Sequence, residues 1–418
     1  MGKRKVLWLC NTMLPELFRR FDIRYSKEGW LIGISNELRK QSDIELHYAC
    51  PQSKNDKIIN ISSNKIHFHC FYAPYKDLYT VKNEVKVQIK KIIDDVQPDI
   101  IHIFGTEMPH TIACVDAVKD KDKIIISIQG LVSEYVNHYL EGIPVSAYLT
   151  GGVIKGRYQT IISQYKEFRR RSENEINAIK KINYVIGRTD WDRAFVRKIN
   201  KRCRYLYCSE TLRDSFYNNK WRIEKIERYS IYVSQGNYPI KGMHNLLEAL
   251  PDVIKRFPGI KVYVAGTADF VNSGHPYGNY IKKMIQKYRL MRHIVFLGTI
   301  GEEEVCRYLL KSHVTVMPSN IENSPNSIGE AMLVGTPVVA PFVGGIPSIV
   351  QHGKEAILYQ PGCKEMLAYS ICQIFERDSL AEYLSENARK RAGTTYNREN
   401  NLHQLLRIYE RIGKKNEF

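Results

Sequence analysis

The stretch that decides the fold is Val314–Val350, which reads VTVMPSNIENSPNSIGEAMLVGTPVVAPFVGGIPSIV. It begins with a short apolar run typical of a buried strand, and a polar loop follows. The spacing then predicts a helix that starts near Pro325 or Ile328, a turn at Gly335 and a second buried strand. A strand, a crossover helix and a further strand form the repeating unit of a parallel sheet.

The same alternation extends through the rest of the chain in two series. Near-continuous apolar runs of strand length are separated by longer amphipathic stretches, which indicates parallel sheets covered by helices on both faces. The runs are Val6–Cys10, Ile44–Cys50, Ile66–Cys70, Ile100–Phe104, Ile124–Ile128 and Tyr184–Gly187, then Tyr229–Ser234, Lys261–Ala265, Ile294–Leu297, Val314–Met317 and Val338–Pro341. We therefore predict an α/β fold with two Rossmann-like, doubly wound parallel-sheet domains that face a cleft.

The domain bounds follow from where the periodicity fades. Residues 201–221 lack a clear apolar period, so we place the break near 205–225 and predict domains at 1–215 and 216–396. Residues 397–418 begin with a helical apolar stripe. That helix either packs on the second domain or returns to the first.

Composition excludes several classes of protein. The chain has 418 residues, of which 44% are hydrophobic and 25% charged, which excludes a disordered or collagen-like chain. No apolar run is long enough for a transmembrane helix, and the apolar stretch near the N-terminus is too short for a secretory signal. The nine cysteines are scattered without CxxC pairs, which predicts a cytoplasmic protein without a structural metal site.

The net charge of +18 indicates an anionic partner. Part of the excess lies in Lys166–Arg204, which reads either as a solvated helix face or as a contact with a membrane or an acceptor. An anionic surface at the inner face of the cell membrane is therefore a candidate partner. Nucleic acid is a second alternative partner. Only the charge suggests it, since the sequence has no recognised nucleic-acid-binding module.

Two carboxylates in the deciding stretch are candidate ligand contacts. Glu322 lies in the predicted loop and Glu330 in the first turns of the helix, so both can reach one ligand from different heights. Carboxylates accept hydrogen bonds from neighbouring sugar hydroxyls, and the free N–H groups of a helix start can hold a phosphate. The plainer alternatives are a solvated loop residue for Glu322 and a capping box with Ser327 for Glu330.

The stretch resembles the donor site of the retaining GT-B glycosyltransferases of family 4. That family carries two glutamates separated by seven residues after a Pro-Ser loop, then E-A-M-x-x-G-x-P-V-V and a G-G-x-P turn. The matching positions here are Pro318-Ser319, Glu322, Glu330-Ala331-Met332, Gly335, Pro337-Val338-Val339 and Gly344-Gly345-Ile346-Pro347. The resemblance covers residues 229–410 well and the first domain only in the order of its elements.

The resemblance implies roles for the donor-site residues. Glu322 would hold hydroxyls of the donor sugar, and Glu330 would hold the ribose of the nucleotide. The backbone around Asn326 and Ser327 would face the diphosphate, and the side chains of Ser324 and Asn326 would add hydrogen bonds.

A second match follows the run at Tyr229–Ser234. The family has Gly-Arg and then Lys-Gly in this loop, and Lys241-Gly242 fits the second pair. A lysine there can neutralise the departing diphosphate, and its alternative reading is a surface lysine in a turn. The family's Gly-Arg pair is replaced by Gln235-Gly236, so another cation must act or the charge rests on Lys241 and the helix amides.

In the first domain, five residues are candidates. Gly29 either lets the backbone approach the donor phosphate or is an ordinary N-cap glycine. Glu107 and His110 follow a strand and are candidates for acceptor contact or for the base that takes its proton. Gln129 stands where the family often has histidine and could bind a donor hydroxyl, while His138 is a further base candidate that nothing in the sequence places.

Four further polar residues carry weaker expectations. His102 lies inside a strand pattern, which favours a core histidine over a ligand. Arg188, Asp190 and Asp192 are interpreted as structural ion pairs between the domains, with Arg188 facing the donor diphosphate as the alternative.

The resemblance thus implies a retaining glycosyltransferase without a cofactor or bound metal. The donor would be a UDP- or GDP-sugar, and the acceptor a glycan or lipid-linked hydroxyl in surface polysaccharide or glycolipid synthesis. An epimerase of the same fold that acts on a nucleotide sugar is the alternative enzyme class.

Overall fold

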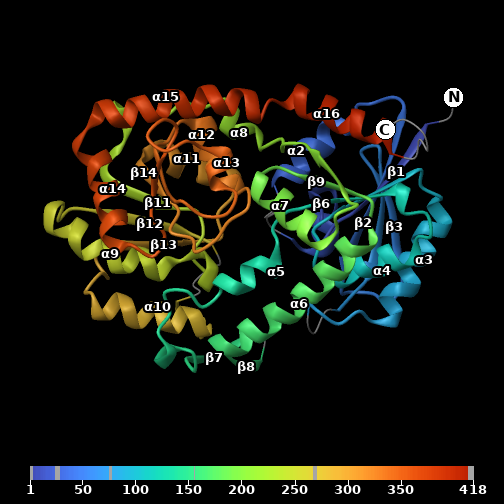
Figure 1. Ribbon diagram of the computed structural model, residues 1–418, viewed down its shortest axis with the longest axis horizontal. Coiled ribbons are helices and arrows are strands. Elements are labelled where there is room, and N and C mark those ends of the chain that lie inside the picture. Colours follow the sequence, from blue (N-terminus) through green and yellow to red (C-terminus); the bar gives the residue numbers. More distant parts are fainter. Residues whose placement is uncertain (1–2, 24–28, 75–77, 155, 267–270, 413–418) are drawn as a thin grey trace. The chain divides into compact units, whose positions relative to one another are not determined.

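The computed structural model describes residues 3–23, 29–74, 78–154, 156–266 and 271–412. These residues divide into two compact units. Unit 1 contains residues 1–134, 167–212 and 396–418, and unit 2 contains residues 135–166 and 213–395. The chain therefore enters unit 2 twice and ends in unit 1 (Figure 1).

Unit 1 is built on an eight-stranded sheet with the order β10-β9-β6-β5-β1-β2-β4-β3. Its strands are β1 (Arg4–Leu9), β2 (Ile44–Gln52), β3 (Ile59–Ser63), β4 (Ile66–Tyr72), β5 (Ile100–Phe104), β6 (Ile124–Ser127), β9 (Tyr184–Gly187) and β10 (Arg204–Tyr207). All pairings are parallel except that of β3 with β4. The order reverses between β1 and β5, so the loops after these two strands flank a topological switch point.

Helices cover the unit 1 sheet because its strands are apolar on both faces. The helices of this unit and its borders are α1 (Phe18–Phe21), α2 (Gly29–Leu38), α3 (Asn83–Val96), α4 (Pro109–Ala117), α5 (Val132–Tyr135), α6 (Ile161–Lys181), α7 (Asp190–Ile199) and α16 (Arg398–Arg411). A core cluster joins the sheet to α3, α4, α6 and α7, with Leu7, Ile101 and Ile126 on the sheet and Ile89 and Ile179 on the helices. Helix α2 contacts α16.

The C-terminal helix α16 joins unit 1 through a buried polar chain. Trp8 can only donate, so its Nε1–H donates to the hydroxyl of Tyr409 at 2.9 Å. That hydroxyl lies 2.6 Å from Nδ1 of His102, whose Nε2 lies 2.7 Å from Oγ of Ser127. Burial lowers the pKa of His102 to about 3, so the ring is neutral. The expectation of a core histidine is met.

Unit 2 has a six-stranded parallel sheet with the order β13-β12-β11-β14-β15-β16. Its strands are β11 (Glu227–Val233), β12 (Lys261–Ala265), β13 (Ile294–Gly298), β14 (Ser312–Val316), β15 (Val338–Pro341) and β16 (Ile357–Tyr359). In sequence order this is 3-2-1-4-5-6, the order of a dinucleotide-binding Rossmann sheet. The switch point lies between β11 and β14, and ligands of such sheets bind beside it, outside the carboxyl ends of the strands.

Helices lie on the unit 2 sheet in two groups. The helices are α8 (Asp214–Tyr217), α9 (Met243–Arg256), α10 (Pro276–Lys287), α11 (Glu302–Lys311), α12 (Asn326–Val334), α13 (Ile346–Ile349), α14 (Lys364–Glu376) and α15 (Asp378–Thr395). Helix α9 packs against α14, while α12 packs against α8, α11 and α15 (Figure 1). An antiparallel hairpin of β7 (Gly151–Ile154) and β8 (Arg157–Thr160) lies against α10.

The predicted α/β fold with two parallel sheets is confirmed, and each apolar run in the sequence is a strand. The excursion of residues 135–166 into unit 2 was not predicted. It is held there by contacts to its backbone, since the side-chain Nδ2 of Asn279 donates to the carbonyl of Gly151 at 2.8 Å. Such contacts leave no periodicity in the sequence.

Candidate functional site

The switch point of unit 2 brings Lys241 and Glu322 together. Lys241 ends the short 3₁₀ helix Pro239–Lys241 in the loop after β11, and Glu322 lies in the loop after β14. Their Nζ and Oε1 atoms are 2.6 Å apart. The hydroxyl of Ser319 donates to the same Oε1 at 2.8 Å. Glu322 is 4% exposed, so this is a nearly buried ion pair at the edge where Rossmann-like sheets generally bind their ligands.

Two glycines hold the loops that carry this pair. Gly242 has φ +63°, and a Cβ there would overlap the carbonyl oxygen of Pro318, so the two loops touch backbone to backbone. Gly344 has φ +52°, and a Cβ there would overlap the carbonyl oxygen of Glu322. The N–H of Gly345 donates to that same carbonyl at 3.0 Å. The glutamate loop is therefore held from both sides.

The charge of Lys241 is stabilised by its surroundings. Burial opposes the ammonium, but Glu322 and Tyr238 outweigh this effect and raise the pKa of Lys241. The ring of Tyr238 also lies 5.7 Å from the Nζ atom. A permanently charged ammonium at this place can stabilise negative charge on a ligand, because partial burial weakens competition from water.

Glu330 forms a second ion pair in unit 2. It lies on α12, and its Oε1 accepts from Nη2 of Arg213 at 2.7 Å. The side chains are 12% and 15% exposed. Burial raises the pKa of Glu330 above its usual value, and the charge of Arg213 partly offsets this. Arg213 lies in the stretch without periodicity, and no feature of the sequence pointed to it.

The predicted capping box of Ser327 with Glu330 is wrong. Helix α12 begins at Asn326 with Pro325 at its N-cap, and no side chain caps it. Ser327 is therefore inside the first turn, and Glu330 lies beyond the position that reaches back to an N-cap. Its carboxylate turns to Arg213 instead. Ser324, Asn326 and Ser327 are all partly exposed at this helix start.

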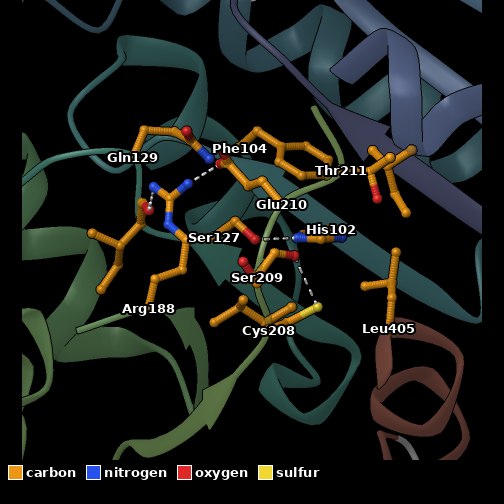
Figure 2. Close-up of a pocket in the computed structure, with 13 residues that line it drawn as sticks. His102, Phe104, Ser127, Gln129, Arg188, Cys208, Ser209, Glu210, Thr211 and Leu405 are labelled. Atoms are coloured by element: carbon orange, nitrogen blue, oxygen red, sulfur yellow. Dashed lines mark hydrogen bonds and ion pairs between the residues drawn. The ribbon is translucent and has the colours of Figure 1, made fainter. Parts of the chain in front are cut away.

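Unit 1 contains a separate pocket at the ends of β5, β6 and β9. It is lined by Ile34, His102, Phe104, Ser127, Ile128, Gln129, Ile186, Arg188, Cys208, Ser209, Glu210, Thr211 and Leu405. Figure 2 shows the guanidinium of Arg188 directed at Glu210, with which it forms an ion pair. Their side chains are 6% and 9% exposed, and Nη2 of Arg188 also donates to the carbonyl of Ile128 at 3.0 Å.

The loop that carries Gln129 is held by a buried acid. Glu175 on α6 accepts from the N–H groups of Val132 and Ser133 at 3.0 and 2.8 Å, and it also accepts from the Thr106 hydroxyl. Burial raises the pKa of Glu175 to about 7, although these hydrogen bonds act in the opposite direction. The carboxyl thus fixes the start of α5 directly after the Gln129 loop.

The chain matches two known families. Residues 214–391 match the family described as Glycosyl transferases group 1, and residues 25–164 match the one described as Glycosyl transferase 4-like. Each match spans less than half of the chain, and together they support a glycosyltransferase of the group 1, 4-like kind. The family match at 214–391 includes Lys241, Glu322 and Glu330.

Relatives agree with this assignment over part of the chain. The D-inositol 3-phosphate glycosyltransferase of Corynebacterium urealyticum is 28% identical over 177 residues, which are 41% of this chain and 41% of that protein. The chain aligns with less than half of the length of the first curated relatives it matches.

Solved structures resemble the whole chain in fold. Sucrose-phosphate synthase from Thermosynechococcus elongatus has a TM-score of 0.70 at 16% identity, with 98% of both chains covered. HepE of Anabaena in complex with UDP and glucose has a TM-score of 0.69 at 16% identity, with 98% of this chain and 100% of that chain covered. The predicted GT-B fold is thereby confirmed.

The position at which the family carries an arginine is filled by packing in this chain. Gly236 is buried, and a Cβ there would lie 3.3 Å from Cγ1 of Val264 and 3.4 Å from Cβ of Met243. A long side chain at this position would force its neighbours to move. The cations that the structure places on carboxylates in this unit include Lys241 and Arg213.

The candidate residues of the first domain do not all lie where the sequence predicted. Gly29 is buried at the start of α2. Glu107 pairs with Arg171 at 2.8 Å. His110 is fully buried on α4 beside Phe71, and burial lowers its pKa to about 3, so the expectation that it faces a ligand is not met.

His138 lies in the part of the chain that belongs to unit 2. Its Nδ1 is 2.7 Å from a carboxylate oxygen of Glu141, and its carbonyl accepts from the amide of Asn320 at 3.2 Å. Asn320 stands between Ser319 and Glu322 in the loop after β14, so the segment around His138 contacts the same loop as the Lys241–Glu322 pair.

The expected ion pairs of Arg188, Asp190 and Asp192 take a different form. Arg188 pairs with Glu210 within unit 1. Asp192 instead completes a capping box with Thr189 at the start of α7. Among the described residues, no group of three or more His, Cys, Asp or Glu is arranged to hold a metal ion.

The glycine that joins the two loops gives a direct test of the site. We expect Gly242→Ala to lower the free energy of unfolding by about 2 kcal/mol or more, because a left-handed φ and a backbone overlap cannot both be relieved locally. Gly259→Ala is the control, since nothing lies within 4 Å of a Cβ there. Urea denaturation measures both, and equal stability of the two variants would contradict the backbone contact.

Proposed function

We propose that this chain is a retaining glycosyltransferase that moves a sugar from a UDP- or GDP-sugar to a hydroxyl acceptor. The observation that supports this proposal most strongly is the Lys241–Glu322 ion pair at the switch point of the Rossmann-like sheet of unit 2. Support comes also from the family match at 214–391, and HepE, a structure of similar fold, binds UDP and glucose.

The donor would be held by groups of different chemistry. Nζ of Lys241 has three donors and can bind a diphosphate oxygen while it remains beside Glu322. The carboxylate of Glu322 would accept from hydroxyls of the sugar, and that of Glu330 would accept from the ribose. The N–H groups at the start of α12 would add partial positive charge at the diphosphate, with Ser324, Asn326 and Ser327 around them.

The chemistry needs no enzymic nucleophile. The acceptor oxygen forms a bond to the anomeric carbon as the bond from that carbon to the diphosphate oxygen breaks. The acceptor's proton passes to the departing phosphate oxygen on the same face of the sugar, which retains configuration. Lys241 and the α12 N–H groups stabilise the negative charge that develops on the nucleoside diphosphate.

The pocket of unit 1 is the proposed acceptor side. It combines apolar walls such as Phe104 and Leu405 with the polar groups of Gln129, Arg188 and Thr211. This mixture suits a sugar ring, which has an apolar face and hydroxyls at its edge. The proposed acceptor is a glycan or a lipid-linked sugar of surface polysaccharide or glycolipid synthesis.

A thermal-shift measurement followed by product analysis tests the proposal. A true donor should raise Tm by several degrees, because a ligand at 100 times its Kd stabilises the folded state by about 2.7 kcal/mol. NMR of the product should then show a new glycoside with the donor's anomeric configuration. If no UDP- or GDP-sugar shifts Tm, or if the product is an epimerised nucleotide sugar, the proposal is wrong. A gel shift with nucleic acid at physiological salt tests the remaining alternative.

No helix in the described part of the chain is long and apolar enough to cross a bilayer. We propose a cytoplasmic enzyme that associates peripherally with the inner face of the cell membrane. The net charge of +18 supports attraction to anionic lipid.

A further inference from the structure

The segment of residues 135–166 exposes apolar side chains to an unusual degree. The three most exposed large hydrophobic side chains of the described residues all lie in it: Val145 and Leu149 at 75% and Tyr158 at 68%. Val153 is also more than half exposed. Single exposed apolar residues are ordinary, but four within fourteen positions indicate a binding surface.

The hairpin of β7 and β8 presents two of these side chains on one face. Val153 is the cross-strand partner of Tyr158, so both point to the same side of the hairpin. Gly152 points to the opposite side, where a Cβ would overlap the carbonyl oxygen of Gly274 just before α10. The hairpin is thus fixed to unit 2 by its glycine face, and the apolar face is turned outward.

The turn before the hairpin is also well anchored. Ala147 is buried, and the carbonyl of Tyr148 accepts from the N–H of Ile162 at 3.1 Å. These contacts leave Val145 and Leu149 on the outside of the turn. Their exposure is therefore a property of a fixed backbone and not of a loose end.

Lysines of α10 line a hollow beside the turn that carries Val145 and Leu149. The hollow is lined on one side by Ser146 and Thr150 of the turn and on the other by Lys283 and Lys287 of α10. The one acidic residue in its described lining is Glu248. Lys283 and Lys287 are one helical turn apart and both exposed, so their ammonium groups share one side of the helix.

We propose that this surface docks the protein on an anionic lipid bilayer. The exposed side chains of Val145, Leu149, Val153 and Tyr158 enter the interfacial region, while Lys283 and Lys287 bind lipid phosphates at the hollow. Apolar tips beside cationic side chains are the pattern of proteins that lie on a membrane, and the lysines make an anionic bilayer a better occupant than a second basic copy of this chain. This inference rests on the proposed function only for its purpose, because docking on the bilayer would bring the enzyme close to a lipid-linked acceptor.

Vesicle sedimentation with purified full-length protein tests the surface. The probes are phosphatidylcholine vesicles with and without phosphatidylglycerol. We expect the wild type to bind only the vesicles that contain phosphatidylglycerol. The double variant Lys283→Glu with Lys287→Glu should lose about tenfold or more of its vesicle affinity. A variant with serine at the four apolar positions should lose as much. Matched controls are Tyr369→Ser with Tyr383→Ser, which are 54% and 51% exposed elsewhere in unit 2, and Lys364→Glu with Lys390→Glu.

The outcomes separate this inference from the proposed function. Failure of the wild type to bind the anionic vesicles, or equal losses in the control variants, would overturn it. So would a light-scattering measurement in which the serine variant converts a dimer to a monomer while vesicle binding is unchanged. Each variant is also tested for its Tm shift with the nucleotide sugar. A normal shift together with lost vesicle binding supports docking, and vesicle binding without any nucleotide-sugar shift would refute the proposed function alone.

Discussion

Lys241→Ala is expected to lower the turnover of sugar transfer by at least about 100-fold, the effect of removing one charged donor from a preorganised site. The lysine is held 2.6 Å from Glu322 in a place with little water, so its charge is available to a departing diphosphate without reorganisation. Donor KM should change less, because the charge matters most as negative charge develops. Initial rates at saturating donor measure the effect.

The same substitution should destabilise the fold, and this allows a control. Removing Lys241 leaves a carboxylate that is 4% exposed without its cation, and breaking a buried pair costs about 3–5 kcal/mol. Combining Lys241→Ala with Glu322→Ala should recover part of that stability without recovering turnover. Lys241→Arg keeps the charge and should fold normally. Turnover close to wild type in Lys241→Ala at a temperature where it is folded would contradict the assigned role.

The strands that sequence predicts best are those buried on both faces. Every expected strand is present, and all of them except β13 lie inside a sheet, where parallel strands are apolar along their length. The strands that sequence analysis missed include β3, β10 and β16, and each lies at the edge of its sheet. Edge strands have one hydrogen-bonding partner and more solvent, so β3 and β10 alternate or expose their side chains and lack the continuous apolar signal.

The residues of the candidate site also differ in how well the sequence predicts them. Lys241 and Glu322 follow apolar runs that become β11 and β14, so sequence could place both at one sheet edge although they lie 81 positions apart. Arg213 is 117 positions from Glu330 and lies in a stretch without periodicity or motif. Its role depends on a side-chain contact that only the packed structure defines. The capping box failed for a related reason, since the start of a helix is the least certain part of its pattern.

Arg213→Ala is expected to raise the donor KM by about tenfold or more while turnover changes little, because a lost charge-assisted hydrogen bond is worth about 1.5–3 kcal/mol. Arg213 holds the carboxylate of Glu330 at 2.7 Å, and Glu330 is the proposed ribose ligand. The substitution removes the positioning cation but leaves the carboxylate in the site. Steady-state kinetics with varied donor separates KM from turnover.

The pH profile then distinguishes positioning from direct contact with the diphosphate. Burial already raises the pKa of Glu330, and the charge of Arg213 partly lowers it again. Without Arg213 the pKa should rise further, so the carboxylate becomes protonated at a higher pH. Because only the ionised form accepts from two ribose hydroxyls, donor KM in Arg213→Ala should worsen as pH falls, and from a higher pH than in the wild type. Arg213→Lys should restore the profile of the wild type in part, whereas Glu330→Gln should have a high KM that no longer depends on pH in this range. If Arg213→Ala instead lowers turnover equally at all pH values, Arg213 stabilises the departing diphosphate directly and takes the part of the arginine that Gly236 replaces.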